Sequence, residues 1–377
     1  ESPFTVKLTT TALSLDVTTT ADAGPGSLRE AFANAALVPG PDVLGVDPAL
    51  AGQTITLLSP IVLNDPSGVS LDALPFEGGL VLSAGHTNRH FIVAGGNASL
   101  LGLRLVDGAA PRGGDFPAQG GSILNLGTLE LIGCAFVGNA AISGDGQGAG
   151  GAVFNNGSMS MDNCVLSTNV TDGSGGALAA YGVNLSLLVC RFEGNQALDG
   201  GAVDGDAAYG SCTFVRNVAT RDGGAVHGFG EYSGCVFSAN EAGGDGGAMA
   251  GGGLFQRSAI VSNRAQHDGG GVAGSGLFEN CTFSGNQAGA TGGALAGEGQ
   301  FDSCTVAANR AGAGAGGIHF RGSAVSLKNS IVAGNQGQPA DVKQEVANLP
   351  LLGVNLIGDL VGSGFSAGPA VLTGDPR

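Results

Sequence analysis

Basic residues are scarce in this sequence: Lys and Arg together number 15 of 377 residues, against 31 Asp and Glu. The resulting formal charge of −16 would repel a phosphate backbone over most of the surface, so nucleic acid is excluded as an expected partner. Long apolar runs are also missing, since no stretch reaches the roughly 18 residues that a membrane-spanning helix needs. The seven cysteines include no closely spaced CxxC pair, which leaves a zinc site or a thioredoxin-like redox site without support.

Glycine is the residue in excess, at 71 of 377 positions. It is costly inside helices and favoured where the backbone turns tightly, so an ordinary helical domain is excluded. The glycines follow no three-residue period, which excludes collagen. With 43% hydrophobic and 12% charged residues, the chain is too apolar for a disordered segment, and we expect it to fold.

One repeat runs through residues 134–335 in nine units. Each unit has a Cys or Ser, an apolar residue two positions later and an Asn five positions later, and successive units are 22 to 30 residues apart. The first column is Cys134, Cys164, Cys190, Cys212, Cys235, Ser258, Cys281, Cys304 and Ser330. The Asn column is Asn139, Asn169, Asn195, Asn217, Asn240, Asn263, Asn286, Asn309 and Asn335. Alternation of the Cys-x-Phe type is typical of a strand with one face turned inward.

The period most often found, 23 residues, is too short for a propeller blade or a pair of helices and predicts two or three short strands per unit. We therefore predict an all-β parallel solenoid forming one domain over residues 1–377. The cap and first rungs are expected at 1–100, the regular rungs at 101–335 and a less regular end at 336–377. Unpaired solenoid ends can join edge to edge, so self-association through them is one expectation.

Stacking of the rungs explains the residue types in the columns. Side-chain amides of successive Asn residues can donate to and accept from each other, which predicts a structural ladder through Asn195, Asn217, Asn240, Asn263, Asn286 and Asn309. The Cys column is expected to be buried and reduced, because stacked Cβ atoms ~4.8 Å apart are farther apart than the ~3.8 Å of a disulfide. A third column, Tyr209, Tyr232, Phe255, Phe278 and Phe301, is expected in the core, with room made by glycine.

A helix from about residue 27 to 36 is predicted near the start of the chain. Ser27 and Glu30 have the spacing of a capping box, and an apolar stripe at helical spacing follows at Leu28, Ala31, Phe32 and Ala35. Such a helix could cover the open N-terminal rung. The alternative is a surface helix on the side of the rod.

Two sets of motifs resemble known families. Phe283-Ser-Gly-Asn286 followed by Gly292-Gly-Ala294, and similar pairs in other units, resemble the FxxN and GGA repeats of polymorphic outer-membrane-protein adhesins. Thr18-Thr-Thr-Ala-Asp22 with Gly26-Ser-Leu-Arg-Glu-Ala31 is similar to the start of the bacterial extracellular CSLREA-motif family, except that Gly26 replaces the Cys of that motif. These resemblances imply a single-stranded right-handed parallel β-helix at the cell surface or outside the cell. They transfer no catalytic residues, and they imply that the native chain continues beyond Arg377.

A row of aspartates is the first candidate site. Asp199, Asp222, Asp245 and Asp268 each precede a Gly pair and recur at steps of 23. If they stack, neighbours ~4.8 Å apart repel by roughly 1 kcal/mol in water, so solvent, Arg221, His267 or a bound cation has to offset the charge. Calcium is the cofactor that suits such a row, whereas the plain alternative is that Asp before Gly favours a turn.

The second candidate site is a mixed cluster on the outer face. Asp204 and Asp206 of one rung are expected beside His227 and Glu231 of the next, the one constellation in the sequence suited to acid–base catalysis. Against catalysis, Ala250, Ala273 and Ala296 follow in the His227 column and predict a flat surface.

The leading functional hypothesis is a secreted or cell-surface β-helix that acts without catalysis in adhesion, spacing or assembly, with an extracellular polysaccharide or protein as ligand. One alternative is a carbohydrate-binding protein or a carbohydrate-active enzyme, a polysaccharide lyase or glycoside hydrolase, using the face near Asp204–Glu231. Another is a filament-forming subunit.

Overall fold

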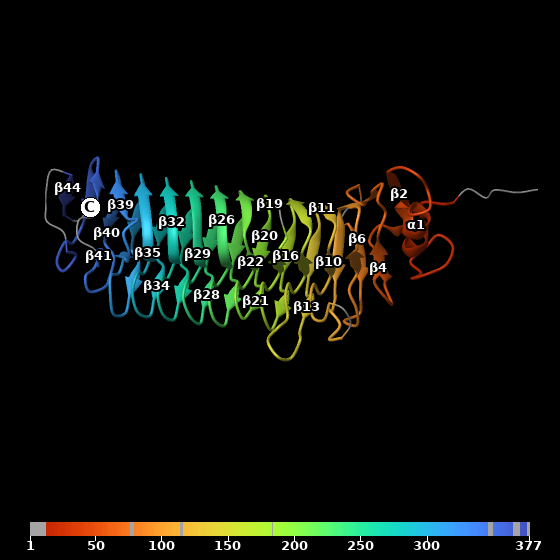
Figure 1. The fold of residues 1–377 in the computed structure, drawn as a ribbon, viewed down its shortest axis with the longest axis horizontal. Helices are drawn as coiled ribbons and strands as arrows, with labels where there is room; N and C mark the ends of the chain where they lie inside the picture. The colour runs from red at the N-terminus through yellow and green to blue at the C-terminus, as the bar shows by residue number, and fades with distance from the viewer. Residues whose placement is uncertain are drawn as a thin grey trace, which may run out of the picture.

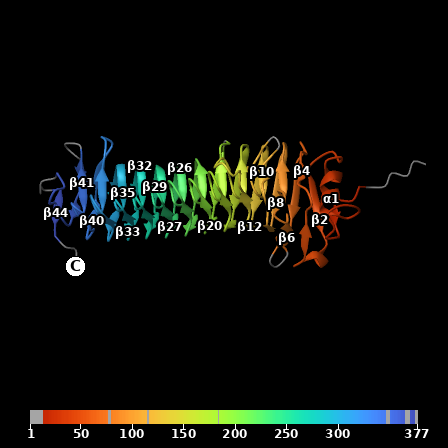
Figure 2. The ribbon, with the colours of Figure 1, turned by 90° about the horizontal axis from the view of Figure 1, so that it is seen from below.

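A computed structural model describes residues 13–75, 79–113, 116–182, 184–345, 350–364 and 370–374. The chain winds into a parallel β-solenoid of about 13 turns. Figures 1 and 2 show an elongated rod in which the chain advances from α1 (Leu28–Ala35) at one end to β44 (Val371–Thr373) at the other. The predicted all-β parallel solenoid is confirmed.

Each regular turn contributes to three parallel sheets, which contain 22, 14 and 8 strands among the described residues. In one turn these strands are β26 (Val226–Ser233), β27 (Val236–Ser238) and β28 (Glu241–Ala242). We call the 22-stranded sheet the broad sheet. Its strands that matter below are β8 (Asn97–Leu101), β11 (Thr128–Ile132), β15 (Ser158–Asp162), β19 (Leu185–Leu188), β22 (Val203–Gly205), β23 (Ala207–Gly210), β26, β29 (Met249–Gln256), β32 (Val272–Glu279), β35 (Leu295–Asp302) and β38 (Ile318–Phe320).

The core is a set of stacked columns, as the repeat predicts. Tyr209, Tyr232 and Phe255 are buried, and their rings stack with centroids 4.7 and 4.5 Å apart. Glycine makes room for them: a Cβ at Gly230 would lie 2.7 Å from the ring of Tyr232. All seven cysteines are buried and reduced.

The Asn ladder is present and extends beyond the predicted members. The Nδ2 atom of Asn240 donates to Oδ1 of Asn263 at 2.9 Å, and the backbone N–H of Asn240 donates to the same oxygen at 3.0 Å. This pattern repeats from Asn139 to Asn335. The ladder ends on Asp341, whose Oδ1 accepts both bonds from Asn335 at 3.0 and 2.8 Å. Burial raises the pKa of Asp341, so the last acceptor of the ladder is a desolvated carboxyl group.

Left-handed backbone forms two corners of each regular turn. The residue before every ladder Asn has positive φ, in the series Gly138, Thr168, Gly194, Arg216, Ala239, Ser262, Gly285, Ala308 and Gly334. The residue before every Cys or Ser of the first column has it too, including the β-branched Val189 at φ 54°. Most of these residues are not glycine and do not prefer positive φ by themselves. The corner conformation is therefore imposed by the surrounding hydrogen bonds.

Helix α1 packs against β1 (Asp16–Val17), β2 (Asp42–Val46) and β4 (Ile61–Leu63) at the N-terminal end of the rod (Figure 1). Ser27 accepts a hydrogen bond from the N–H of Glu30, as predicted, but Glu30 accepts from the N–H of Gly26 rather than that of Ser27. The four apolar residues of the helix are buried. The ring of Phe32 packs edge-on against that of Phe91, with the ring centroids 5.9 Å apart. The helix therefore covers the first turn of the core. Among the described residues, no helix combines the length and apolarity needed to cross a membrane.

Candidate functional site

The outer face of the broad sheet carries the residues of the predicted acid–base cluster. Strands β26, β29, β32 and β35 bend in their middle at glycines with φ between 130° and 142°, namely Gly228, Gly251, Gly274 and Gly297. At this bend a Cβ on Gly251 would lie 2.1 Å from the carbonyl oxygen of Gly228 in the previous turn. Only glycine fits such a position, so the bend is built into the repeat.

Asp204 and His227 form the centre of the cluster. They are register partners in β22 and β26, with Asp204 Oδ1 2.6 Å from His227 Nδ1. Tyr181 donates its hydroxyl to the other carboxylate oxygen at 2.7 Å. Asp204 is 7% exposed, and its hydrogen bond raises the pKa of His227, while burial raises the pKa of Tyr181. Within the described residues, Nε2 of His227 makes no hydrogen bond, so the imidazole can exchange a proton with a ligand or solvent.

The other two predicted members do not join this pair. Asp206 Oδ1 accepts the backbone N–H of Phe229 at 2.8 Å. Glu231 is the register partner of Ala208 on one side and Leu254 on the other, and its carboxylate makes no hydrogen bond within the described part of the chain. The acid–base groups that the structure brings together are therefore Asp204, His227 and Tyr181.

The aspartate row stacks as predicted, and its carboxylates bond to the backbone. Oδ1 of Asp222 accepts the N–H of Asp245 at 2.8 Å, and Oδ1 of Asp245 accepts the N–H of Asp268 at 2.9 Å. Asp199 is paired with Arg221 through Nε at 2.7 Å, and Asp268 is paired with Arg321 at 2.9 Å. Within the described residues, no group of three or more His, Cys, Asp or Glu side chains is arranged to hold a metal ion. Each carboxylate thus caps the turn that follows it in the stack.

A second histidine lies in the same outer column as His227, four turns farther along. Register pairs connect His227 to Ala250, Ala273, Ala296 and His319 in turn. His319 is 4% exposed, with Nε2 2.8 Å from Glu345 and Nδ1 2.8 Å from the hydroxyl of Thr291, and burial lowers its pKa. This group is enclosed, whereas the imidazole of His227 is accessible.

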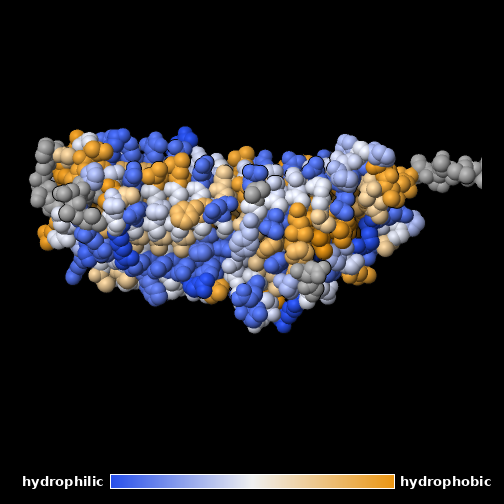
Figure 3. All heavy atoms as spheres, viewed as in Figure 1, coloured by the Kyte–Doolittle hydropathy of each residue, from blue (hydrophilic) through white to orange (hydrophobic). Residues whose placement is uncertain are grey.

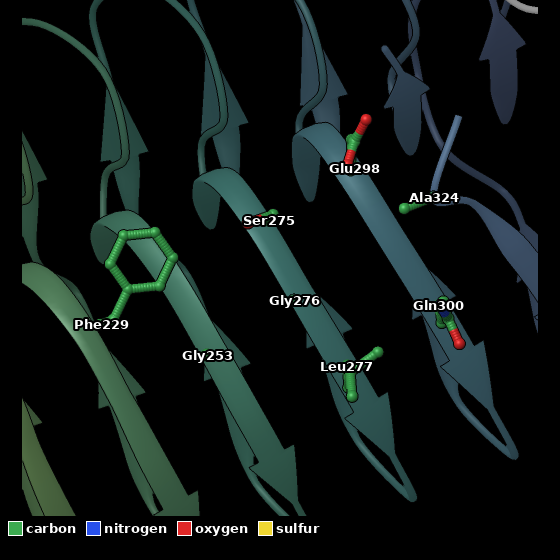
Figure 4. A pocket seen from close by; sticks show the side chains of 8 residues that line it. All are labelled: Phe229, Gly253, Ser275, Gly276, Leu277, Glu298, Gln300 and Ala324. Atoms are coloured by element: carbon green, nitrogen blue, oxygen red, sulfur yellow. The ribbon is translucent and has the colours of Figure 1, made fainter. Parts of the chain in front are cut away.

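Three hollows meet at Phe229, which is 54% exposed and stands out from the glycine-rich strands (Figure 4). Their volumes are about 280, 460 and 510 Å³. The largest is lined by Asp206 and Glu231, and the 460 Å³ hollow by His227 and the aspartate row.

Sequence reasoning missed Tyr181 and Phe229. The signal for Tyr181 was a polar aromatic residue one turn before Asp204, two positions after Ala179, the register partner of Asp204. The signal for Phe229 was an aromatic residue at an outward position between two glycines.

Comparison with known proteins finds a repeat similar to one turn of the rod. Residues 280–298 match the Chlamydia polymorphic membrane protein repeat. The match covers β33 (Thr282–Ser284), ladder residue Asn286, β34 (Gln287–Ala288) and the first half of β35. No curated protein matches the sequence significantly. The predicted resemblance to the polymorphic membrane protein repeats is thus supported over one turn, while the resemblance to the CSLREA-motif family stays a prediction.

Proposed function

We propose that this protein is a cell-surface or secreted β-helix that acts without catalysis as an adhesin-like rod. The observation that carries the proposal is the repeat match at residues 280–298, because members of that repeat family are outer-membrane surface proteins. The matched signature residues are structural here: Phe283 is a core residue and Asn286 a ladder residue. The family's repeat thus maintains the rod, and its outer surface is available for contact.

The geometry of the outer face supports a role without catalysis. The carboxylate–imidazole pair of Asp204 and His227 is tied up by its own hydrogen bonds: Asp204 bonds to His227 through one carboxylate oxygen and accepts the Tyr181 hydroxyl through the other. The floor beyond His227 consists of Ala250, Ala273 and Ala296 with glycines between them. A flat floor of this kind offers little to orient a scissile bond.

The proposal is tested by location and by adhesion. Antibodies raised against the folded rod should label intact cells of the source organism, and protease treatment of those cells should remove the label. Beads coated with the rod should adhere to host or neighbouring cells more than beads coated with rod unfolded by denaturant. Label found only after cell lysis would refute the surface assignment, and equal adhesion of both bead types would refute the adhesin-like role.

The accessible imidazole of His227 favours a second candidate, a carbohydrate-active enzyme with His227 as acid or base. Its test is release of reducing ends, or of unsaturated sugars, from a panel of polysaccharides. Activity that is lost in His227→Ala but kept in Ser238→Ala, a change on another sheet, would favour the enzyme over the adhesin.

A further inference from the structure

We propose that the outer face of the broad sheet binds a neutral linear polysaccharide lying along the rod axis. This inference deepens the proposed surface role and rests on it for its biological setting. The binding itself is a property of the isolated chain and can be measured independently.

Two parallel columns of outward side chains form the proposed trough. The first column is Asn97, Thr128, Ser158, Asn184, Asp206, Phe229, Gly252, Ser275 and Glu298, and the second is Ser99, Glu130, Ser160, Ser186, Ala208, Glu231, Leu254, Leu277 and Gln300. Register pairs place the second column one residue per turn over nine turns. In the first column they connect Asn97 to Ser158 and Phe229 to Glu298, while Asn184 and Asp206 come from the turns between and line the 510 Å³ hollow together with Phe229. Eight steps at the spacing of neighbouring strands make a face roughly 38 Å long.

Neighbouring hollows along these columns share lining residues. A hollow of about 350 Å³ over β8, β11 and β15 shares Asn184 with the 510 Å³ hollow, which in turn shares Phe229 and Gly253 with the 280 Å³ hollow. The result is one shallow trough that follows the rod axis. A linear polymer fits this row of hollows better than a compact ligand, because the hollows follow one another along the columns and share lining residues.

Two chemically different halves make up the trough. The half toward the N-terminus is lined by hydroxyl and amide side chains. Among them, the hydroxyl groups of Thr128, Ser158 and Ser160 make no hydrogen bond within the described residues. The other half has a floor of glycine with the exposed faces of Phe229 and Leu277, which is 48% exposed (Figure 4). Sugars present both hydroxyl groups and apolar C–H faces, so both halves have a counterpart on a polysaccharide.

Charge decides which polysaccharide fits. Among the described residues lining these three hollows, Asp206, Glu130, Glu231 and Glu298 are acidic and none is Lys or Arg. A polyanion such as polygalacturonate would be repelled, since nothing in the lining offsets its charge. Neutral chains carry no such penalty.

A peptide is the less suitable occupant. Strands of the broad sheet between β8 and β35 are paired on both sides, so this face has no free edge to which a peptide strand could add. Phe229 stands by itself among glycines rather than in a row of aromatic side chains, so the groove lacks the lining that extended proline-rich segments recognise. The space-filling view shows the visible side of the rod as a mosaic of polar and apolar residues, with its most extended hydrophobic areas toward the N-terminal end (Figure 3).

Affinity electrophoresis tests the proposal with native gels containing hydroxyethyl cellulose, glucomannan, soluble starch or polygalacturonate. We expect at least one neutral polymer to retard the whole chain, and polygalacturonate not to. Phe229→Ala and Ser160→Arg, which change opposite halves of the trough, should each raise the dissociation constant at least tenfold. The matched control is Phe116→Ala, a partly exposed aromatic residue that lines none of these hollows. All variants should keep the wild-type melting temperature, because the changed side chains are on the surface.

Several outcomes would overturn this inference. One is no retardation by any neutral polymer, and another is retardation that Phe229→Ala and Ser160→Arg leave unchanged. Retardation by polygalacturonate alone would overturn the charge argument and the proposal with it. Failure here is distinguishable from failure of the proposed function. If surface label and bead adhesion persist in Phe229→Ala, the adhesin-like role is supported even though the trough is not needed for it. If the protein is found only inside cells but is still retarded by a neutral polymer, the trough is supported and the surface role is refuted.

Discussion

At the residue scale, the ladder shows how one side chain can serve two turns. Each Asn accepts the backbone N–H and the amide N–H of the previous turn through one oxygen, and donates to a carbonyl of the core strand. These groups are buried, so water cannot replace the bonds. The carboxyl group of Asp341 ends the series, because an acceptor is needed there and no further Asn follows in the described turns.

Replacing Asn240 by Ala should therefore lower the free energy of unfolding by about 1–3 kcal/mol, since buried backbone groups lose their partner. Chemical denaturation followed by circular dichroism measures the change. Asn97→Ala is the control, because Asn97 is exposed and lies outside the ladder. Equal midpoints for the two variants would show that the ladder contributes nothing.

His90 gives the N-terminal part of the rod a dependence on pH. Its Nε2 donates to the carbonyl of Leu82 at 3.0 Å, and its Nδ1 accepts from the hydroxyl of Ser122 at 3.0 Å. Burial lowers the pKa of His90 to about 4. The unfolded chain therefore binds the proton more tightly. The contribution of neutral His90 to the free energy of unfolding is therefore fully present above pH 6.5 and is lost as pH falls toward 4.

Over that interval the loss attributable to His90 should approach about 3 kcal/mol. Unfolding midpoints measured between pH 7 and 4 should fall less steeply in His90→Gln, which keeps a donor toward Leu82. His86→Gln, a change at an exposed histidine, should keep the wild-type slope. The same slope in all three proteins would contradict the assignment.

At the scale of the element, the aspartate row explains why four successive Gly-Gly turns begin with Asp, namely Asp199, Asp222, Asp245 and Asp268. The carboxylate accepts the N–H of the equivalent residue in the next turn, which satisfies a backbone donor where the chain leaves the strand. The arginine partners of Asp199 and Asp268 offset charge near the two ends of the row. The middle carboxylates, Asp222 and Asp245, keep one oxygen without a protein partner within the described residues.

Asp245→Asn discriminates between turn capping and calcium binding. An amide oxygen can still accept the N–H of Asp268, and removal of one charge relieves repulsion along the row. Capping therefore predicts unchanged or higher stability, by about 1 kcal/mol at low salt, and the same melting temperature in calcium as in chelator. Asp162→Asn, an exposed carboxylate outside the row, is the control. A calcium-dependent rise in the wild-type melting temperature that Asp245→Asn abolishes would instead establish a metal site.

At the scale of the whole molecule, each turn contacts its two neighbours and little else, as expected for a solenoid. Successive turns in the middle of the rod are interchangeable in register: Val226 pairs with Met249, and Met249 with Val272. Stability should then be close to a sum of terms for turns and for the interfaces between them.

Deleting residues 226–248 removes one complete turn and joins Ala225 to Met249. The shortened chain should fold, with unchanged strand content per residue and a lower free energy of unfolding, because one interface is lost. Deleting residues 226–237 breaks the register and should give an unfolded or aggregated chain. Circular dichroism and limited proteolysis compare the two. If both deletions fold equally well, stacking in register is not what holds the rod together.

Among the site residues, the sequence predicted the pairing of Asp204 with His227 because both stand at the same position of adjacent repeats. It did not separate Glu231 and Asp206 from that pair. The reason is geometric: Glu231 lies four positions after His227, beyond the glycine bend, and the carboxylate of Asp206 turns back to the N–H of Phe229. Tyr181 was missed because its turn lacks the aspartate and histidine that drew attention to the next two turns.

The sequence by itself determined the repeat, the parallel stacking, the inward columns and the Asn ladder. A period of 23 residues with Cys, Phe and Asn at constant offsets leaves one way to bury the apolar side chains. Only the tertiary structure decided the left-handed corners at residues such as Val189, the acceptor role of Asp341 and the trough around Phe229. The corner at Val189 and the trough depend on contacts between turns, such as the bond from the N–H of Val189 to the carbonyl of Gly210, and the role of Asp341 depends on where the ladder brings Asn335. No local preference of Val, Asp or Phe specifies these contacts.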